Sequence, residues 1–381
     1  MTAFEGEHSI TEKRHGFNYV LSEYDILLTD QVKDLGGFYN AHAHIDRNST
    51  LKLRYLQAVG IDPIEGASLP LRVKQNLVGE LHKGPAYKHI DLKNRIKQNL
   101  ENQYSMLTTT VDSMIDATSG VGLSVIDIAN EVKEEVKDKM IFRIGCHPIF
   151  GFKEEERWEI YKEAAKKCDF LGGLPEKDDK PTSIGYKQHL KRILLLGQEL
   201  HKPVHVHVDQ LNDPSENGTE TLTRAVDWIG APEIEGINEP TVWAIHSISP
   251  SCYSEKRFSR LINSLLKHKV GVIVCPSAAI SMRQLRPINT PIHNSITRVL
   301  EMIEAGIRVK IGTDNVCDVF IPSSDGCMLN ETKLLSNAIR FYIINVLAKI
   351  AAGKELNRMD REMVRRALAA DQEIFSKIKE S

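Results

Sequence analysis

The stretch GGFYNAHAHID at residues 36–46 decides how the fold of this chain is interpreted. We expect a strand over residues 37–43. Side chains two residues apart on a strand point to the same side, so His42 and His44 would face one way, as two ligands of one metal ion must. A single pair of this kind arises by chance in chains of this size. Its meaning therefore depends on what the rest of the chain places beside it.

Seven further runs are, like the first, short, apolar and rich in β-branched residues, and longer charged segments with helical periodicity separate them. Alternation of strands and helices favours a parallel sheet, and a set of eight strands fits a closed (β/α)8 TIM barrel better than an open sheet. The other expected strands are 108–115, 140–146, 170–174, 204–208, 241–245, 270–274 and 308–312, and the expected helices are 93–104, 126–136, 154–167, 187–200, 220–229, 257–268 and 295–305.

We divide the chain into an N-terminal extension (1–35), the barrel (36–350) and a C-terminal helical segment (351–381). Residues 50–90 are richer in Gly, Pro and Leu than a short barrel loop, so we expect an extended, irregular first loop that covers a site. Neither end shows the alternating pattern of strands. A flanking β-sandwich is therefore expected to be absent.

The composition is that of an ordinary soluble globular protein, with 381 residues, 41% hydrophobic and 26% charged. A net charge of −2 gives no general attraction to nucleic acid or to an anionic membrane. There is no apolar run of about 18 residues, and the N-terminus is too polar for a secretory signal, so we expect a cytoplasmic protein. The six cysteines lack C-x-x-C spacing, which argues against a zinc ribbon and a disulfide framework.

Polar side chains gather at the ends of the expected strands, which form the catalytic face of such a barrel. His42 and His44 end the first strand, His207 lies on the fifth, His246 ends the sixth and Asp314 follows the eighth. Three or four imidazoles and one carboxylate suit a zinc or ferrous ion with a position open for water. One such histidine alone is more often structural, but four strand ends with these residues favour a metal site.

At this point the sequence resembles the amidohydrolase superfamily, and within it the cytosine deaminase branch. HAHID at 42–46 is similar to that branch's H-x-H-x-D, and HVDQ at 207–210 is similar to its H-C-D-E. The segment that runs into GTDN at 312–315 is similar to the branch's approach to its last metal ligand. The likeness extends over residues 36 to about 350.

The resemblance implies one divalent ion bound by His42, His44, His207 and Asp314, with zinc expected and iron as the alternative. His246 would hold the hydrolytic water. Bound water would lose a proton near neutral pH, Asp314 would act as general base, and protonated His246 would steady the oxyanion. The expected reaction is hydrolysis of a C–N bond in a small polar compound, such as a cyclic amidine or an amide.

Gln210 departs from the branch, which has a proton-carrying glutamate at this position. A glutamine exchanges no proton at useful pH. Either Asp314 does all the proton transfer, or another acid such as Glu176 or His147 takes part, or the reaction has been lost. The last alternative would leave a catalytically degenerate barrel that binds a metal and a small molecule.

The expected partner is a small-molecule substrate, with no nucleic acid and no membrane, and a homo-oligomer is left open. There is no phosphate-binding glycine motif, and no H-x-E with P-C-x-x-C of nucleic-acid deaminases. Arg283 follows the seventh strand and could pair with a carboxylate or phosphate, or lie in a solvated loop. Glu176 or Lys177 could bridge a second metal, but we expect one. The candidate substrate-binding residues are His147, Glu176, Gln210, Arg283 and Asn315.

Overall fold

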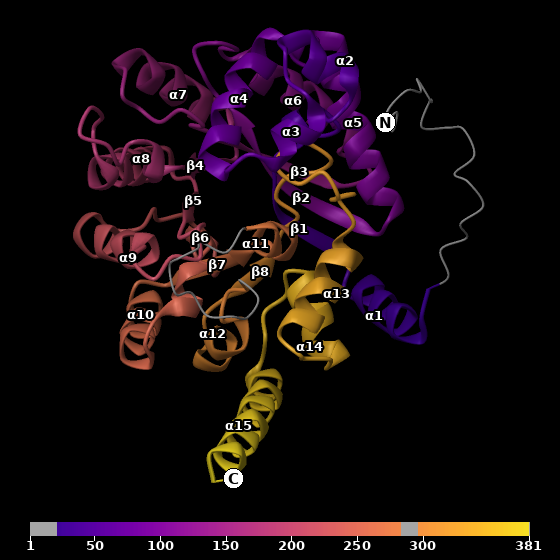
Figure 1. Cartoon of the computed structure of the whole chain (residues 1–381), viewed down its shortest axis with the longest axis vertical. Coiled ribbons are helices and arrows are strands. Elements are labelled where there is room, and N and C mark those ends of the chain that lie inside the picture. Colours follow the sequence, from indigo (N-terminus) through magenta and orange to yellow (C-terminus); the bar gives the residue numbers. More distant parts are fainter. Residues whose placement is uncertain (1–20, 283–295, 381) are drawn as a thin grey trace.

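The computed structural model describes residues 21–282 and 296–380. Its strands form one parallel sheet in which each strand pairs with the next, and the helices lie around it (Figure 1). This is a (β/α)8 TIM barrel, as expected, and every strand end lies within one residue of its predicted position. The strands are β1 (Phe38–Ala43), β2 (Thr108–Asp116), β3 (Ile141–His147), β4 (Phe170–Gly173), β5 (Val204–Val208), β6 (Val242–His246), β7 (Val270–Val274) and β8 (Val309–Ile311).

The expected helices are all present, although the predicted start of the last one lies outside the described residues. Helix α10 illustrates why these segments are helical. The Ser254 side chain caps its first turn, and Phe258, Leu261 and Leu265 form one buried face. Three further helices of the described chain follow β8, and α13 and α14 are the first two of them. The helices are α5 (His89–Ser105), α6 (Ser124–Val136), α7 (Glu155–Lys167), α8 (Tyr186–Leu200), α9 (Gly218–Ile229), α10 (Glu255–Lys267), α11 (Pro276–Ser281), α12 (Val299–Ala305), α13 (Met328–Ala338) and α14 (Ile344–Ala351).

The expectation of an irregular loop over residues 50–90 is wrong, because most of this segment is helical. It contains α2 (Leu53–Leu56), α3 (Pro63–Ser68) and α4 (Leu71–Lys83). Pro63 occupies the first turn of α3 and Pro70 is the N-cap of α4. Proline is favoured at the start of a helix, since the missing N–H would have no partner there. The two prolines therefore mark the starts of helices, although the sequence suggested an irregular loop there.

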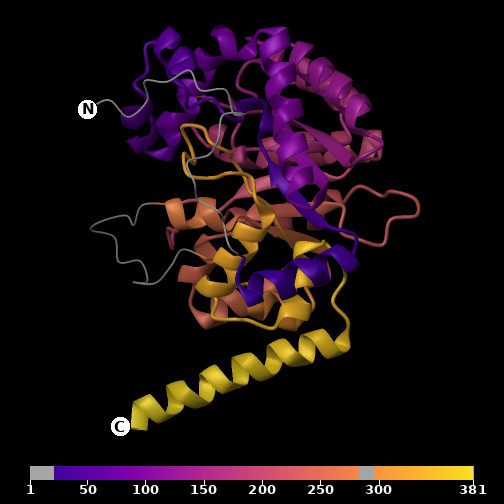
Figure 2. The same ribbon diagram turned by 90° about the vertical axis from the view of Figure 1, so that its right-hand side faces the viewer.

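Two helices do not belong to the repeated strand–helix units of the barrel. They pack against helices from the C-terminal half of the barrel. The first, α1 (Glu23–Asp34), begins at a capping box formed by Ser22 and Asp25 and lies against α14, where it buries Leu28 and Val32. The last, α15 (Arg358–Glu380), packs on α12, and Figure 2 shows it as a long helix below the rest of the fold. No strand of the described chain lies outside the barrel sheet, so this part contains no β-sandwich. Within the same residues, no helix combines the length and the apolar character needed to cross a membrane.

Large side chains fill the barrel interior and rely on glycines in the neighbouring strands. Met114, Phe170 and Trp243 belong to one buried cluster. A Cβ atom at Gly145 would overlap the ring of Phe170, and one at Gly271 would overlap the ring of Trp243. The barrel interior is close-packed and leaves no room for added atoms.

The barrel closes between its last and first strands. The backbone N–H of Asp314 donates to the carbonyl of His42 at 2.9 Å, and the N–H of His44 donates to the carbonyl of Asp314 at 3.3 Å. Gly312 permits this approach, because a Cβ there would lie 2.7 Å from the backbone nitrogen of His42. The closing seam therefore runs through residues that the sequence singles out as metal ligands.

The close approach of Phe170 predicts that Gly145→Ala destabilises the barrel, since the ring must shift to make room. We expect the free energy of unfolding to fall by about 1–3 kcal/mol, measured by urea denaturation. Gly120→Ala is the control, because a Cβ atom there would lie 3.7 Å from Thr118 Oγ1, its nearest neighbour beyond the adjacent residues, which is an ordinary van der Waals distance. Equal urea midpoints for the two variants would contradict the packing described.

Candidate metal centre

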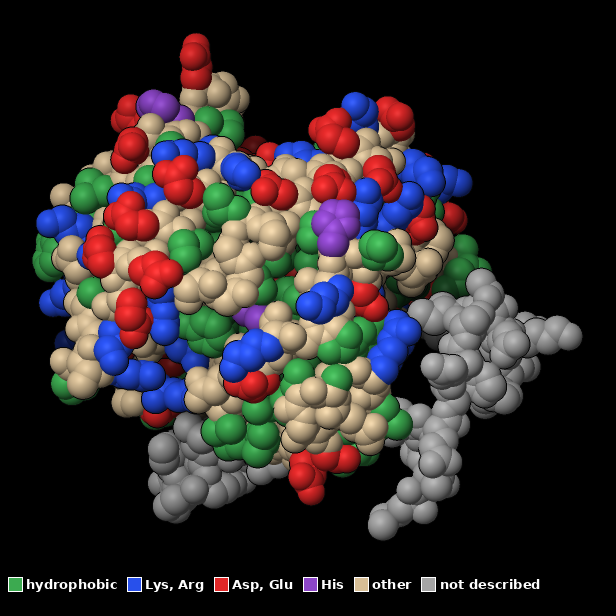
Figure 3. All heavy atoms as spheres, turned by 90° about the horizontal axis from the view of Figure 1, so that it is seen from above, with side chains coloured by type: hydrophobic (Ala, Val, Ile, Leu, Met, Phe, Trp, Pro, Cys, Tyr) green, Lys and Arg blue, Asp and Glu red, His purple; other side chains and the backbone are tan. Residues whose placement is uncertain are grey.

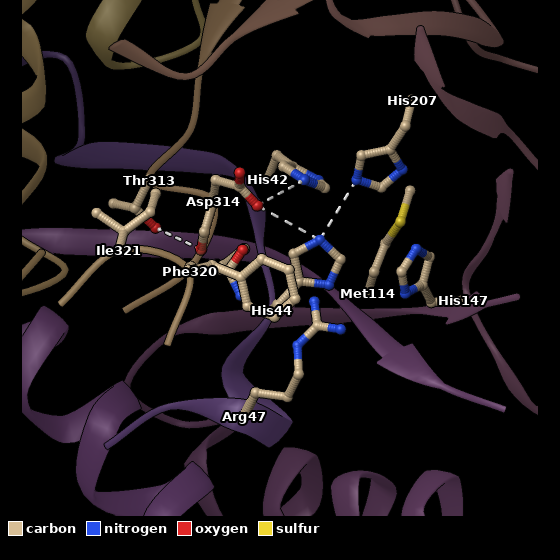
Figure 4. Close-up of polar contacts among 12 residues, drawn as sticks. His42, His44, Arg47, Met114, His147, His207, Thr313, Asp314, Phe320 and Ile321 are labelled. Atoms are coloured by element: carbon tan, nitrogen blue, oxygen red, sulfur yellow. Dashed lines mark hydrogen bonds and ion pairs between the residues drawn. The ribbon is translucent and has the colours of Figure 1, made fainter. Parts of the chain in front are cut away.

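Four strand ends bring the predicted ligands to one point at the carboxyl end of the barrel. His42 comes from β1, His44 follows it, His207 comes from β5, His246 ends β6 and Asp314 follows β8. Figure 4 shows His42, His44, His207 and Asp314 directed toward one another. All five side chains are buried. The sequence-based set is thus assembled as one cluster.

The spacing of the ligand atoms matches one coordination shell. The Nε2 atoms of His44 and His207 are 3.3 Å apart, and Asp314 Oδ1 lies 3.5 Å from His42 Nε2 and 3.4 Å from His44 Nε2. A tetrahedral ion with bonds of about 2.0–2.1 Å places its ligand atoms about 3.3 Å apart. These three separations are those expected between neighbouring ligands of a single ion. Two overlapping groups of ligand atoms could hold an ion, His42 with His44 and His207, and His42 with His246 and Asp314.

The imidazoles of His44, His207 and His246 are in the neutral form, which is the form that binds a metal. Burial lowers the pKa of His44 and His207 well below the usual value, and it lowers the pKa of His246 to about 4. His207 Nδ1 donates to the carbonyl of Gly173 at 3.1 Å, which leaves Nε2 with a lone pair toward the cluster. Both ring nitrogens of His42 are buried without a hydrogen-bond partner. Such unsatisfied nitrogens fit a metal ion better than a purely structural role.

Two of these residues have an unusual backbone conformation. His246 has φ of 74° and Asp314 has φ of 59°, in the left-handed region that non-glycine residues rarely adopt. Both stand where a strand turns into its loop. Strained residues of this kind cluster at functional sites, where the surrounding fold holds them in place.

A cavity of about 370 Å³ opens in front of the cluster. Apolar side chains from several loops and from the α3–α4 segment form much of its wall, and Leu71, Lys74 and Gln75 of α4 are among the lining residues. The segment 50–90 therefore does cover the site, as expected, although it does so with helices. The volume suits a small molecule.

Three of the predicted substrate-binding residues, His147, Gln210 and Asn315, line this cavity. His147 Nδ1 is 2.8 Å from Asp116 Oδ1, while its Nε2 is buried without a partner. Asn315 Nδ2 donates to Asp318 Oδ2 at 2.5 Å. The predicted residue Arg283 lies outside the described residues.

Glu176 stands behind Gln210 and is not among the residues that line the cavity. Gln210 Nε2 donates to Glu176 Oε2 at 3.3 Å, and Glu176 Oε1 is buried without a partner. Burial, followed by the negative charge of Glu216, raises the pKa of Glu176 to about 8. A protonated carboxyl group therefore backs the glutamine that replaces the expected acid. In the described chain, Glu176 belongs to no group of His, Cys, Asp and Glu side chains that could hold a metal ion.

Asp209 and His205 lie two positions to either side of His207 in the sequence. The Asp209 carboxylate accepts hydrogen bonds from the backbone N–H groups of Gly218, at 2.5 Å, and Thr219, at 2.8 Å, so it caps α9. The His205 ring stacks on Phe170 at 4.3 Å in the barrel interior. Both therefore serve the structure around the cluster.

Sequence reasoning missed a buried carboxylate, Asp116, that organises one side of the site. It lies 3.1 Å from His82 Nε2 and 3.4 Å from the guanidinium of Arg47, besides its contact with His147. Burial alone would raise the pKa of Asp116, but Arg47 and the two histidines hold it well below the usual range. Asp116 ends β2, so the strand-end rule could have found it. Arg47 directly follows the HAHID motif.

Comparison with known proteins supports this fold. No model of a protein family matches the chain. An uncharacterised protein of Haemophilus influenzae is 29% identical over 276 residues, which is 72% of this chain and 94% of that protein. Among solved structures, the 5-methylcytosine deaminase of Klebsiella pneumoniae liganded with 5-fluorocytosine has a TM-score of 0.67 at 20% identity and 87% and 82% coverage of this chain and that chain.

Two other solved structures are similar. The N-isopropylammelide isopropylaminohydrolase of Burkholderia multivorans has a TM-score of 0.63 at 17% identity, with 83% of this chain and 73% of that chain covered. Arabidopsis ADAL complexed with GMP has a TM-score of 0.57 at 13% identity, with 90% and 98% covered. At these identities the likeness establishes the shared barrel fold.

The raised pKa of Glu176 predicts that this residue destabilises the folded protein more at high pH than at low pH. The folded protein holds this proton up to about pH 8 and the unfolded chain loses it near pH 4.5, so this group's contribution to stability falls as pH rises between these values. We therefore compare the free energy of unfolding of Glu176→Gln with that of wild type by urea denaturation at pH 5 and at pH 8.5. The difference, variant minus wild type, should be more favourable to the variant at pH 8.5 by on the order of 2 kcal/mol. The exposed Glu199→Gln is the control. A constant difference at both pH values would contradict the prediction.

Proposed function

We propose that this protein is a metal-dependent hydrolase of the amidohydrolase superfamily that cleaves a C–N bond in a small polar heterocyclic compound. The observation that carries the proposal is the buried group of ligand atoms at the ends of β1, β5 and β8, in which three pairs of neighbouring atoms lie 3.3–3.5 Å apart. The similar solved structures support it, because they include a 5-methylcytosine deaminase and an N-isopropylammelide isopropylaminohydrolase.

The residues that would hold the metal are His42, His44, His207 and Asp314. Imidazoles with one carboxylate suit zinc, our first expectation, and also ferrous iron. A divalent ion at this position supplies Lewis acidity and makes hydroxide available near neutral pH.

The chain itself supplies the proton transfer. Burial opposes ionisation of Asp314, yet the close approach of His42 Nε2, 3.5 Å from Asp314 Oδ1, leaves the pKa of Asp314 lowered, so it is ionised at neutral pH. It can accept a proton from water as the oxygen bonds to the substrate carbon, and pass that proton to the nitrogen as the C–N bond breaks. His246 Nε2 lies 3.9 Å from Asp314 Oδ2 and would hold the water. With a pKa of about 4, His246 acts as a neutral hydrogen-bonding group, in place of the imidazolium expected from the sequence.

Gln210 supports a second candidate function, a metal-containing barrel that binds a small molecule without turnover. Its amide lines the cavity and donates to Glu176, and an amide cannot carry a proton. This candidate shares the metal centre with the first and differs from it only in the absence of product.

Metal binding gives the first test. Protein from metal-replete medium should contain about one zinc or iron ion per chain, and His207→Ala should weaken the binding at least about 10-fold because it removes one ligand. The exposed His89→Ala is the matched control and should keep the metal. Elemental analysis after dialysis measures both. Wild-type protein without transition metal would overturn the proposal.

Turnover gives the second test, with ammonia release from a panel of aminoheterocycles and cyclic amides as the readout. Asp314→Asn should lower the rate of an active substrate by about 10²–10⁴-fold, because it removes the proposed base. Gln210→Glu should create or increase cytosine deamination, since it restores a proton carrier beside the substrate. Thermal stabilisation by panel compounds without any product would favour the second candidate.

A further inference from the structure

Arg47 is a buried cation at the wall of the cavity. It ends the 3-10 turn Ile45–Arg47 that follows His44, and its exposure is 2%. Figure 4 shows its guanidinium beside the ring of His44, next to the predicted metal ligands. Arg47 also lines the cavity. A positive charge is thus fixed within reach of any small molecule bound there.

The hydrogen bonds of this guanidinium are incomplete. Its Nη1 donates to Asp116 Oδ2 at 3.4 Å, which is long beside the roughly 2.7–2.9 Å of a charge-assisted bond. Its Nε is buried without a partner, and its face lies over the ring of Phe320 at 5.1 Å. A guanidinium has five N–H donors, and a buried donor without an acceptor costs free energy. An acceptor in the cavity would relieve that cost.

A second cation reaches the same space from the covering segment. Lys74 of α4 lines the cavity, and its Nζ donates to the carbonyl of Phe320 at 3.3 Å. Phe320 therefore contacts both cations, through its ring and its carbonyl. Arg47 and Lys74 come from different elements. The positive charge at the cavity wall therefore does not depend on a single residue.

Negative charge on the described cavity wall is limited to one residue. Asp314 is the only acidic side chain among the lining residues, and it is a predicted metal ligand. The carboxylates of Asp46, Asp116 and Asp318 are buried outside the lining, where they lie close enough to Arg47 to offset part of its positive charge. The outer face in Figure 3 differs, since acidic and basic side chains intermingle there. A divalent ion would make the cavity more positive still.

We infer that the cavity selects anionic substrates, with Arg47 and Lys74 binding a carboxylate or an acidic ring oxygen on the heterocycle. This inference rests on the proposed function and narrows its substrate class. The planar guanidinium can form two parallel hydrogen bonds with a carboxylate, and its contact with Phe320 fixes its plane. The volume of about 370 Å³ suits a single ring with short substituents.

Two probes of nearly equal size test the inference, cytosine-5-carboxylate and cytosine-5-carboxamide. Their dissociation constants are measured by calorimetry on the full-length, zinc-loaded protein at pH 7.5. We expect at least about 10-fold tighter binding of the carboxylate. Arg47→Met should remove this preference, and Lys74→Met should reduce it about 3-fold or more. Arg54→Met, at an exposed arginine of α2, is the control and should keep it.

Equal binding of the two probes by wild type overturns the inference, and so does a preference that Lys74→Met leaves unchanged. The Lys74 variant decides the case if Arg47→Met does not fold, because Arg47 is buried and Lys74 is partly exposed. Metal content and ammonia release are measured on the same samples. Hydrolysis of neutral compounds without a carboxylate preference contradicts this inference alone. A carboxylate preference without any turnover contradicts the proposed hydrolase alone.

Discussion

The backbone hydrogen bonds that Asp314 forms with His42 and with His44 close the barrel, and the rest of the structure depends on them. His42 and Asp314 also turn their side chains toward the candidate metal position, with His42 Nε2 and Asp314 Oδ1 3.5 Å apart. Gly312 makes this possible by leaving room for the backbone of His42. The contacts that close the sheet therefore also bring candidate ligands together. Strands β5 and β6 supply the imidazoles on the opposite side.

Buried charge shapes the site as much as the strands do. The imidazoles of His44, His207 and His246 are kept neutral by burial, so their nitrogens are available as ligands or hydrogen-bonding groups. Asp116 stays ionised because three groups surround it, and it orients His147 at the cavity wall. The proton that Gln210 cannot carry is present nearby on Glu176, in a pocket that stabilises its neutral form. The centre thus combines three kinds of group, which are neutral imidazole ligands, one ionised base and fixed cations.

The barrel and its ligands could be predicted from the sequence because both depend on local patterns. Short apolar strands alternate with helices, and the period of two places His42 and His44 on one side. The helices between residues 50 and 90 were missed, since Pro63 and Pro70 are loop signals unless their position in a helix is known. Arg47 with Asp116, and Gln210 with Glu176, meet only after folding across 69 and 34 positions of sequence. No local pattern encodes these contacts.

The closing seam also has a consequence for synthesis of the chain. His42 leaves the ribosome early, whereas Asp314 is made only after some 270 further residues, so the nascent chain lacks a complete ligand set until the eighth strand emerges. Until then one edge of β1 has no partner, and an unpaired edge can pair with another chain. A metal ion bound by the full ligand set would stabilise the closed barrel against opening at this seam.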